Sequence, residues 1–174
     1  MEPIVQLNSQ ANLSEHLASP SEATLGPSNK LDGSHLSPHF KLGEFTKSNS
    51  HPEVYNIPSH EAIANLKRIC GWLEVLRERS GGPIRINSGY RSPQLNRKIG
   101  GVKNSNHLTG CAVDIRVTGM EQAKQYAEIL RKYAEESHQD FDELLIEKNR
   151  YGAIWLHFAV RPRENRCKFL YINA

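Results

Sequence analysis

Hydrophobic side chains recur at steps of three and four residues in two stretches of the chain, and each stretch predicts an amphipathic helix. The first begins at the start signal Pro58-Ser59 and continues until Gly81, where two glycines and a proline end the pattern. The second covers residues 121–136, with alanine, tyrosine, isoleucine and leucine on its apolar face. We expect both helices to pack against a sheet.

Shorter stretches have the apolar and alternating patterns of β-strands. They cover residues 84–87, 111–117, 141–147 and 154–160, with residues 167–173 as a candidate last strand. A polar turn joins the third and fourth of them, which predicts an antiparallel hairpin. A short helix starting at Ser92 and Pro93 follows the first. Helices collected around a small, mostly antiparallel sheet indicate an α+β fold.

The composition of the chain divides it into a leader and one domain. Residues 1–35 contain no aromatic side chain and are rich in serine, asparagine, proline and glycine, so we expect a flexible N-terminal leader. Folded structure is expected from about Leu36, giving a single domain over residues 36–174.

Charge and cysteine content narrow the class of protein. The chain has 22 Lys and Arg against 19 Asp and Glu, too small an excess to imply a nucleic-acid partner. Three cysteines without a CxxC pair suggest reduced thiols rather than a disulfide framework. Neither a signal peptide nor a transmembrane segment is recognisable, and we expect a monomer. The localisation stays unknown at this point.

Three residues remote in sequence suggest a metal site. SNHLTGCAVD, residues 105–114, contains His107 and Asp114, and the strand IWLHFAV carries His157 on the face opposite to its neighbours. Each histidine alone would more often be structural. Two imidazoles and one carboxylate together suit Zn²⁺ and leave a fourth position for water or substrate, which favours hydrolysis.

The stretches SGYRSPQLN, SNHLTGCAVD and WLHF resemble, in order and approximate spacing, the zinc D-alanyl-D-alanine carboxypeptidase family, which includes phage endolysin peptidases. The similarity covers roughly residues 36–172. It implies a hedgehog-like or DD-peptidase-like zinc fold and a zinc metallopeptidase that acts on peptidoglycan stem peptides. His107, Asp114 and His157 match the family's metal ligands.

The same resemblance implies roles for residues around the metal. Arg91 matches an arginine associated with substrate or oxyanion binding, as a planar cation can pair with a carboxylate or with charge that develops on a carbonyl. The hydroxyls of Ser88, Tyr90 and Ser105 are candidates for binding substrate or orienting ligands, and equally for capping turns. Asn96, also in the motif, ranks below them.

The general base is an open choice between two glutamates. Many relatives have glutamate three residues before the last histidine, where this chain has Ile154. Glu147, which ends the strand 141–147, is expected to return beside His157 across the hairpin and to act as the base on zinc-activated water. Glu143, on the same strand face, is the reserve candidate. Cys111 is expected to pack rather than to bind metal.

Two readings of function remain. The first is a zinc-dependent carboxypeptidase or endopeptidase that hydrolyses peptidoglycan amides, and the second is a zinc-containing wall-binding module without catalysis. A purely structural zinc protein is a third possibility, should four protein side chains hold the metal. The sequence does not choose the bond that is cut. A phage lysis enzyme, a virion-associated peptidase and an exported bacterial protein are all consistent with a site of action at the cell wall.

Overall fold

A computed structural model describes residues 32–173 of the chain. The expected leader lies outside these residues except for its last four. Those four contact the rest of the protein, because the backbone amides of Leu42 and Gly43 donate to the carbonyls of Ser34 and Asp32 at 2.9 and 3.0 Å.

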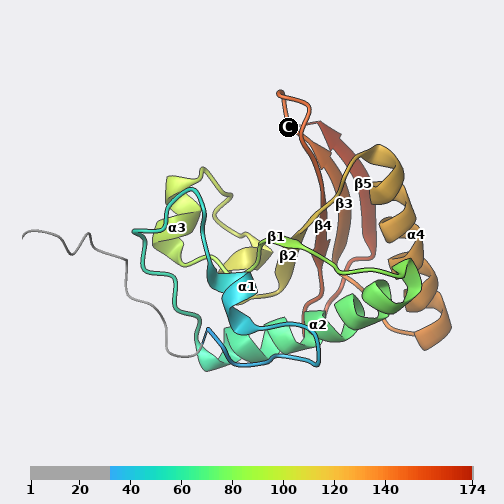
Figure 1. The fold of residues 1–174 in the computed structure, drawn as a ribbon, viewed down its shortest axis with the longest axis horizontal. Coiled ribbons are helices and arrows are strands. Elements are labelled where there is room, and N and C mark those ends of the chain that lie inside the picture. Colours follow the sequence, from blue (N-terminus) through green and yellow to red (C-terminus); the bar gives the residue numbers. More distant parts are fainter. Residues whose placement is uncertain (1–31, 174) are drawn as a thin grey trace, which may run out of the picture.

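The described chain forms helices and one five-stranded sheet (Figure 1). In order, the elements are α1 (Leu42–Thr46), α2 (His60–Ser80), β1 (Ile86–Ser88), α3 (Pro93–Lys98), the 3-10 helix η1 (Asn106–Thr109), β2 (Ala112–Arg116), α4 (Met120–Ser137), β3 (Glu143–Lys148), β4 (Ile154–Ala159) and β5 (Lys168–Asn173). The strand order is β1-β2-β4-β3-β5. Every neighbouring pair is antiparallel except β3 and β5, which confirms the α+β prediction.

The long helices begin and end where the sequence predicts. The Ser59 side chain accepts a hydrogen bond from the amide of Ala62 at 3.1 Å, and α2 stops at Gly81, whose φ of 74° is in the left-handed region. Ser92 caps the short helix α3 in the same way, through the amide of Leu95. None of the helices in the described chain is long and apolar enough to cross a bilayer.

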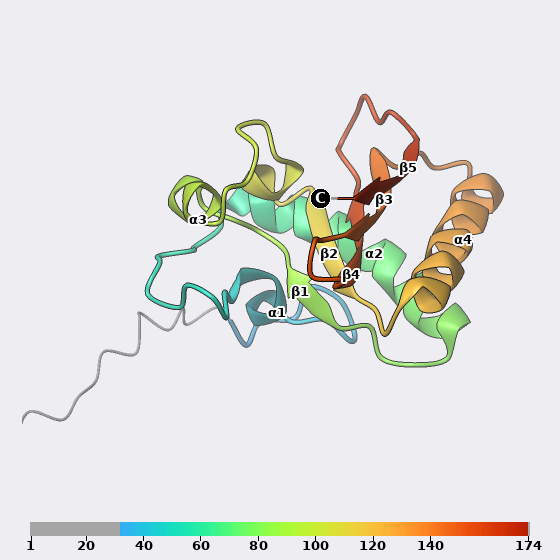
Figure 2. The same cartoon turned by 90° about the horizontal axis from the view of Figure 1, so that it is seen from above.

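One face of the sheet is covered by α2 and α4, which pack against each other (Figures 1 and 2). Trp72 of α2 lies between Tyr133 of α4 and Phe158 of β4, with ring centroids 4.8 and 5.3 Å away. Because side chains alternate along a strand, the buried Phe158 leaves His157 on the other face. The helices thus hold the sheet rigid while the opposite face is available for a site.

Three features of the fold differ from the sequence prediction. β1 begins at Ile86 rather than at residue 84, because Ile84 packs in the core without a partner in the strand register and the register is irregular before Ser88. The short helices α1 and η1 were not predicted, since neither is long enough to show a period. β5 pairs parallel to β3, so the last strand lies at the edge of the sheet, on the side of β3 away from β4.

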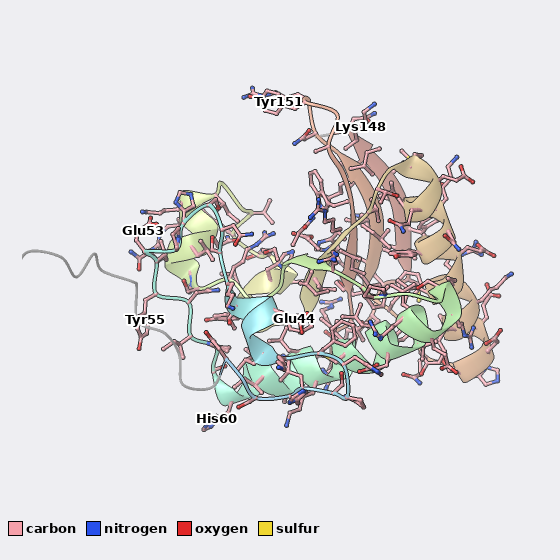
Figure 3. The ribbon with its side chains drawn as sticks, in the orientation of Figure 1. Glu44, Glu53, Tyr55, His60, Lys148 and Tyr151 are labelled. Carbon is pink, nitrogen blue, oxygen red and sulfur yellow. The ribbon has the colours of Figure 1, made fainter. Side chains whose placement is uncertain are left out.

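The β3–β4 hairpin extends beyond the helices. Lys148 and Tyr151 lie at its tip, far from His60 at the start of α2 (Figure 3). The side chain of Asn149 accepts hydrogen bonds from the amides of Tyr151 and Ala153, both at 3.0 Å, and so fixes the turn. This turn sets the register, that is, which residues of β3 and β4 lie opposite each other.

Candidate metal centre

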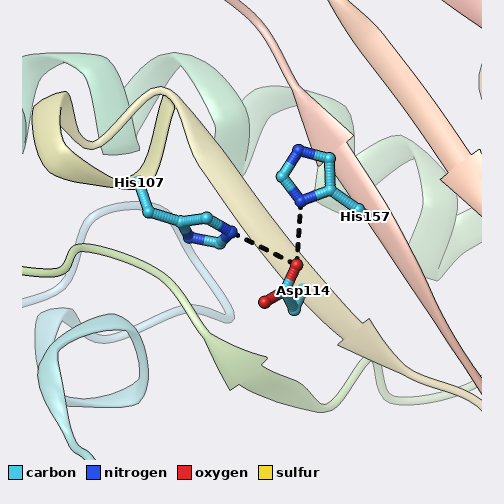
Figure 4. A group of neighbouring side chains, drawn as sticks. All are labelled: His107, Asp114 and His157. Carbon is cyan, nitrogen blue, oxygen red and sulfur yellow. Dashed lines mark hydrogen bonds and ion pairs between the residues drawn. The ribbon is translucent and has the colours of Figure 1, made fainter. Parts of the chain in front are cut away.

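The three residues of the expected metal site lie together on the face of the sheet away from α4 (Figure 4). His107 comes from η1, Asp114 from β2 and His157 from β4, and one ligand atom of each lies within 4.8 Å of the others. Oδ1 of Asp114 lies 3.2 Å from Nε2 of His107 and 2.9 Å from Nδ1 of His157. All three side chains are buried.

The geometry and chemistry of this group fit zinc. Tetrahedral zinc with ligands about 2.0–2.1 Å away places neighbouring ligand atoms about 3.3 Å apart, close to the two distances from Asp114. Imidazole nitrogen and carboxylate oxygen are common zinc donors. In residues 32–173 the group has three members, with no fourth His, Cys, Asp or Glu. A purely structural, four-ligand protein site is therefore not favoured.

Backbone contacts hold His107 in position. Its Nδ1 lies 2.6 Å from the carbonyl oxygen of Gly89. A carbonyl accepts only, so Nδ1 carries the proton and Nε2 is left to face Asp114. The amide of Arg91 donates to the carbonyl of His107 at 3.0 Å, which fixes η1 against the loop after β1. A metal-binding histidine commonly has such a partner on its second nitrogen.

Helix α2 packs against η1 and holds it in place. The side chain of Asn65 donates to the carbonyl of Thr109 at 2.9 Å. Gly110 ends η1 with a φ of 71°, and a Cβ there would lie 2.5 Å from the carbonyl oxygen of Ala62. Only glycine suits both the left-handed backbone and this close approach.

Arg91 binds the second oxygen of Asp114. Its Nη2 donates to Oδ2 at 2.5 Å and its Nε donates to the hydroxyl of Ser88 at 2.9 Å. Oδ1 remains directed at the two imidazoles. Ser88 lies opposite Asp114 in the β1–β2 register, so the serine supports the arginine. The predicted substrate residue Arg91 therefore also orients the carboxylate.

The far nitrogen of His157 faces Glu143. Oε2 of Glu143 lies 3.5 Å from Nε2 of His157, while Oε1 lies 2.9 Å from Nη2 of Arg166. Carboxylates in this position orient a histidine ligand and raise its basicity. Glu143, the reserve candidate for the base, thus lies behind the ligand and is already paired with an arginine.

Asp142 connects η1 to the segment that precedes β5. This fully buried carboxylate accepts hydrogen bonds from Asn106 at 2.8 Å and from Arg166 at 2.6 and 2.8 Å, and pairs with Arg161 at 2.8 Å. It links η1, which carries His107, to the loop that leads into β5. The sequence gives no local signal for this role, because the partners of Asp142 come from distant segments.

Glu147 lies on the strand next to His157, and its role as the base stays a prediction. The hairpin register pairs Leu145 with His157 and Glu147 with Trp155, so Glu147 is a diagonal neighbour of His157. Glu147 faces the same side of the sheet, two residues along from Leu145. Burial raises the pKa of its half-buried carboxyl, with Asp114 adding to this and His157 opposing it.

The other pKa shifts follow from burial and close pairing. Burial lowers the pKa of His107. Burial opposes the ionisation of Asp114, but the two imidazoles hold the pKa of this carboxyl well below its usual range. Burial also opposes a charge on His157, yet Asp114 and Glu143 raise its pKa to about 9. Asp114 is therefore ionised, as a carboxylate that binds metal must be.

The remaining residues singled out from the sequence lie around this group. The Ser105 hydroxyl accepts from the amide of His107 at 3.3 Å and caps η1. Tyr90 is half-buried against the core. Asn96 is buried and donates to the carbonyl of Val102, which is a loop-packing contact. Cys111 is buried outside the ligand group, with its thiol 3.9 Å from the carbonyl oxygen of Thr109.

With this geometry in place, the chain can be assigned to a family of peptidases. It belongs to the peptidase M15 family, whose model matches residues 38–149, more than half of the chain. The resemblance seen in the sequence is thereby confirmed. The match includes His107 and Asp114 but ends before His157, so the third member of the group rests on the geometry of β4.

One similar protein is a zinc D-Ala-D-Ala carboxypeptidase from Streptomyces albus G. It is 32% identical over 78 residues, which cover 44% of this chain and 31% of that protein. The chain therefore matches about a third of the relative's length. The family and this relative imply zinc, and the His-Asp-His group supplies a place for it.

Proposed function

We propose that this chain is a zinc peptidase that hydrolyses amide bonds in the peptide stems of bacterial peptidoglycan. The observation that carries the proposal is the convergence of His107, Asp114 and His157, through one ligand atom each, on the side of the sheet opposite to Phe158. The relative named for D-Ala-D-Ala cleavage supports peptidoglycan as the substrate class. Whether the bond is terminal or internal is left open.

His107, Asp114 and His157 would hold the metal. Zinc bound there would supply Lewis acidity, which polarises a carbonyl and makes water a stronger acid. Two protein groups are then needed: a base to take the proton of the attacking water, and a cation near the carbonyl oxygen.

Glu147 is the better base of the two glutamates. Burial raises its pKa, which makes the carboxylate a stronger proton acceptor, and within residues 32–173 it forms no ion pair. Glu143 is less suited, because Arg166 and His157 share its oxygens and its pKa is lowered. In the proposed reaction Glu147 takes a proton from water and passes it to the leaving amine.

Arg91 is proposed to stabilise the charge on the carbonyl oxygen. Its Nε and Nη2 are used by Ser88 and Asp114. A guanidinium has five N–H donors, so others remain for substrate while the two contacts fix its plane. The arginine can therefore orient the ligand Asp114 and bind substrate at once.

The test compares wild type with Glu147→Gln on purified peptidoglycan. We expect about one zinc per chain in both proteins, new amino and carboxyl ends by mass spectrometry with wild type, and intact stems with the variant. Glu121→Gln, on helix α4 across the sheet, is the matched control and should behave as wild type.

Three other outcomes have distinct meanings. Full activity of Glu147→Gln would remove Glu147 as the base. Loss of zinc from that variant would show that the assignment of metal ligands and base is wrong. Wall binding by zinc-loaded wild type without any product would favour the alternative, a non-catalytic wall-binding module.

A further inference from the structure

The metal ligands belong to a row of side chains that crosses the sheet to its edge. Residues opposite each other in register point to the same face. Asp114 pairs with His157, His157 pairs with Leu145, and Leu145 pairs with Leu170 of β5. Two leucines therefore continue the row that begins with the ligands.

Strand β5 directs an apolar side chain to the side of the site. Leu170 is 41% exposed, whereas Phe169 before it packs toward the core. Leu145, between Leu170 and His157, is 6% exposed and forms the inner end of the same apolar strip. The family match ends at residue 149, so it includes Leu145 but not β5 or Leu170.

A single exposed leucine needs no explanation by itself, but positive charge lies next to this one. Lys168 is two residues before Leu170 and therefore faces the same side, with Nζ 4.0 Å from Oε1 of Glu143. Arg161 and Arg166 belong to the same cluster through Asp142 and Glu143. Three cations against two carboxylates leave one positive charge beside the apolar strip.

Strand spacing gives the reach of the strip. Neighbouring strands lie about 4.8 Å apart, so Leu170, two strands from His157, lies about 10 Å from it along the sheet. An extended peptide advances about 3.3 Å per residue, so Leu170 is about three residues from a carbonyl bound at the metal.

We propose that Leu145, Leu170 and Lys168 form a subsite for an extended peptide, about three residues from the reacting carbonyl. The leucines contact apolar atoms of the peptide, and Lys168 binds a carboxylate that it carries. This subsite rests on the proposed function for its substrate, and it makes the chain prefer long acidic peptides over dipeptides.

The test measures binding in the zinc-loaded Glu147→Gln protein, where hydrolysis does not interfere. The probe is a peptidoglycan stem pentapeptide with a free glutamate carboxyl, titrated by calorimetry. We expect Leu170→Ala to raise Kd about 10- to 50-fold, because three apolar carbons of a partly exposed side chain lose their contact with the peptide. Tyr171→Ala is the control, because Tyr171 is 58% exposed on the opposite face of the same strand and should leave Kd unchanged.

Lys168 is tested with a second form of the probe. Lys168→Met should weaken binding of the free-acid peptide and leave binding of the same peptide with an amidated glutamate carboxyl unchanged. Equal losses for both forms, or equal Kd changes in Leu170→Ala and Tyr171→Ala, would overturn the subsite. Circular dichroism of each variant identifies a loss that comes from misfolding, and Leu170→Val then replaces Leu170→Ala.

Failure of the subsite and failure of the proposed function give different results. Binding that depends on Leu170, in a wild-type protein that releases no product, would reject the peptidase and keep the subsite. Hydrolysis of the stem peptide with a kcat/KM that is insensitive to Leu170 would keep the peptidase and reject the subsite.

Discussion

Arg91 and Asp114 form an ion pair in which one oxygen of the carboxylate binds the arginine and the other faces the two imidazoles. Nη2 of Arg91 holds Oδ2 at 2.5 Å, and Oδ1 is left for the two imidazoles. With Arg91 the carboxylate presents one oxygen in a fixed direction. Without the arginine it would be free to rotate, and the buried anion would lose one of its partners.

We therefore expect Arg91→Ala to weaken zinc binding by about 10- to 100-fold, the usual effect of removing a residue that orients a metal ligand. Competition with a chromophoric chelator measures the affinity without any need for activity. Arg97→Ala, on the exposed side of helix α3, is the control. An unchanged affinity in Arg91→Ala would show that Asp114 needs no such support.

Glu143 and Glu147 should separate metal binding from catalysis. Glu143 faces the far nitrogen of His157, so Glu143→Gln is expected to reduce zinc affinity by about tenfold. Glu147 has no contact of this kind, so Glu147→Gln should keep the affinity of wild type. The same chelator competition compares the two variants, and the opposite ranking would exchange the roles assigned to the glutamates.

Asp142 should make the free energy of unfolding of the metal-free protein depend on pH in the acid range. Burial alone would raise the pKa of this carboxyl, but hydrogen bonds from Arg166 and Asn106, with the charge of Arg161, lower it to about 2. A carboxyl whose pKa is lower in the folded state stabilises the fold above its unfolded pKa near 3.9. That contribution is lost as the pH falls from about 4 to about 2.

In Asp142→Asn this acid-dependent loss should be absent. The variant should also be about 1–3 kcal/mol less stable than wild type at neutral pH, because Arg161 and Arg166, whose side chains are partly exposed, lose their charge partner. Urea unfolding at several pH values measures both effects. Asp140→Asn, an exposed neighbour, is the control. Parallel pH curves for wild type and Asp142→Asn would contradict the role given to this carboxylate.

Two glycines should respond to alanine in opposite directions. Gly110 has a φ of 71° and no space for a Cβ near Ala62, so Gly110→Ala should destabilise the fold by about 1–3 kcal/mol and displace His107. Gly71 lies inside α2 with nothing within 4 Å of an added Cβ. Gly71→Ala should stabilise by about 0.5–1 kcal/mol. Thermal unfolding gives the sign of each change.

The sequence predicted the long elements well, since each depends on a local pattern. The period of α2, its cap at Ser59 and its stop at Gly81 are all short-range signals. The alternation in β4 put His157 on the face opposite to Phe158, as observed. The assignment of the three ligands nevertheless remains a prediction until metal is measured.

What the sequence did not reveal depends on contacts between remote segments. The β3–β4 register follows from a turn fixed by Asn149, and it pairs Leu145 with His157 and Glu147 with Trp155. Asp142 gains its role only because Asn106 and Arg166 meet it from distant parts of the chain. The short 3-10 helix that carries His107 has too few residues for any period to show.

The parallel pairing of β5 with β3 also bears on how the protein stays in solution. β3 would be the outermost strand without β5, and its free amides and carbonyls, flanked by Leu144 and Ile146, would be a template for pairing with another chain. A protein truncated before Lys168 would therefore be prone to aggregation, even with every residue of the zinc site intact. The last six-residue strand acts as a protective edge for the sheet as well as a wall of the proposed subsite.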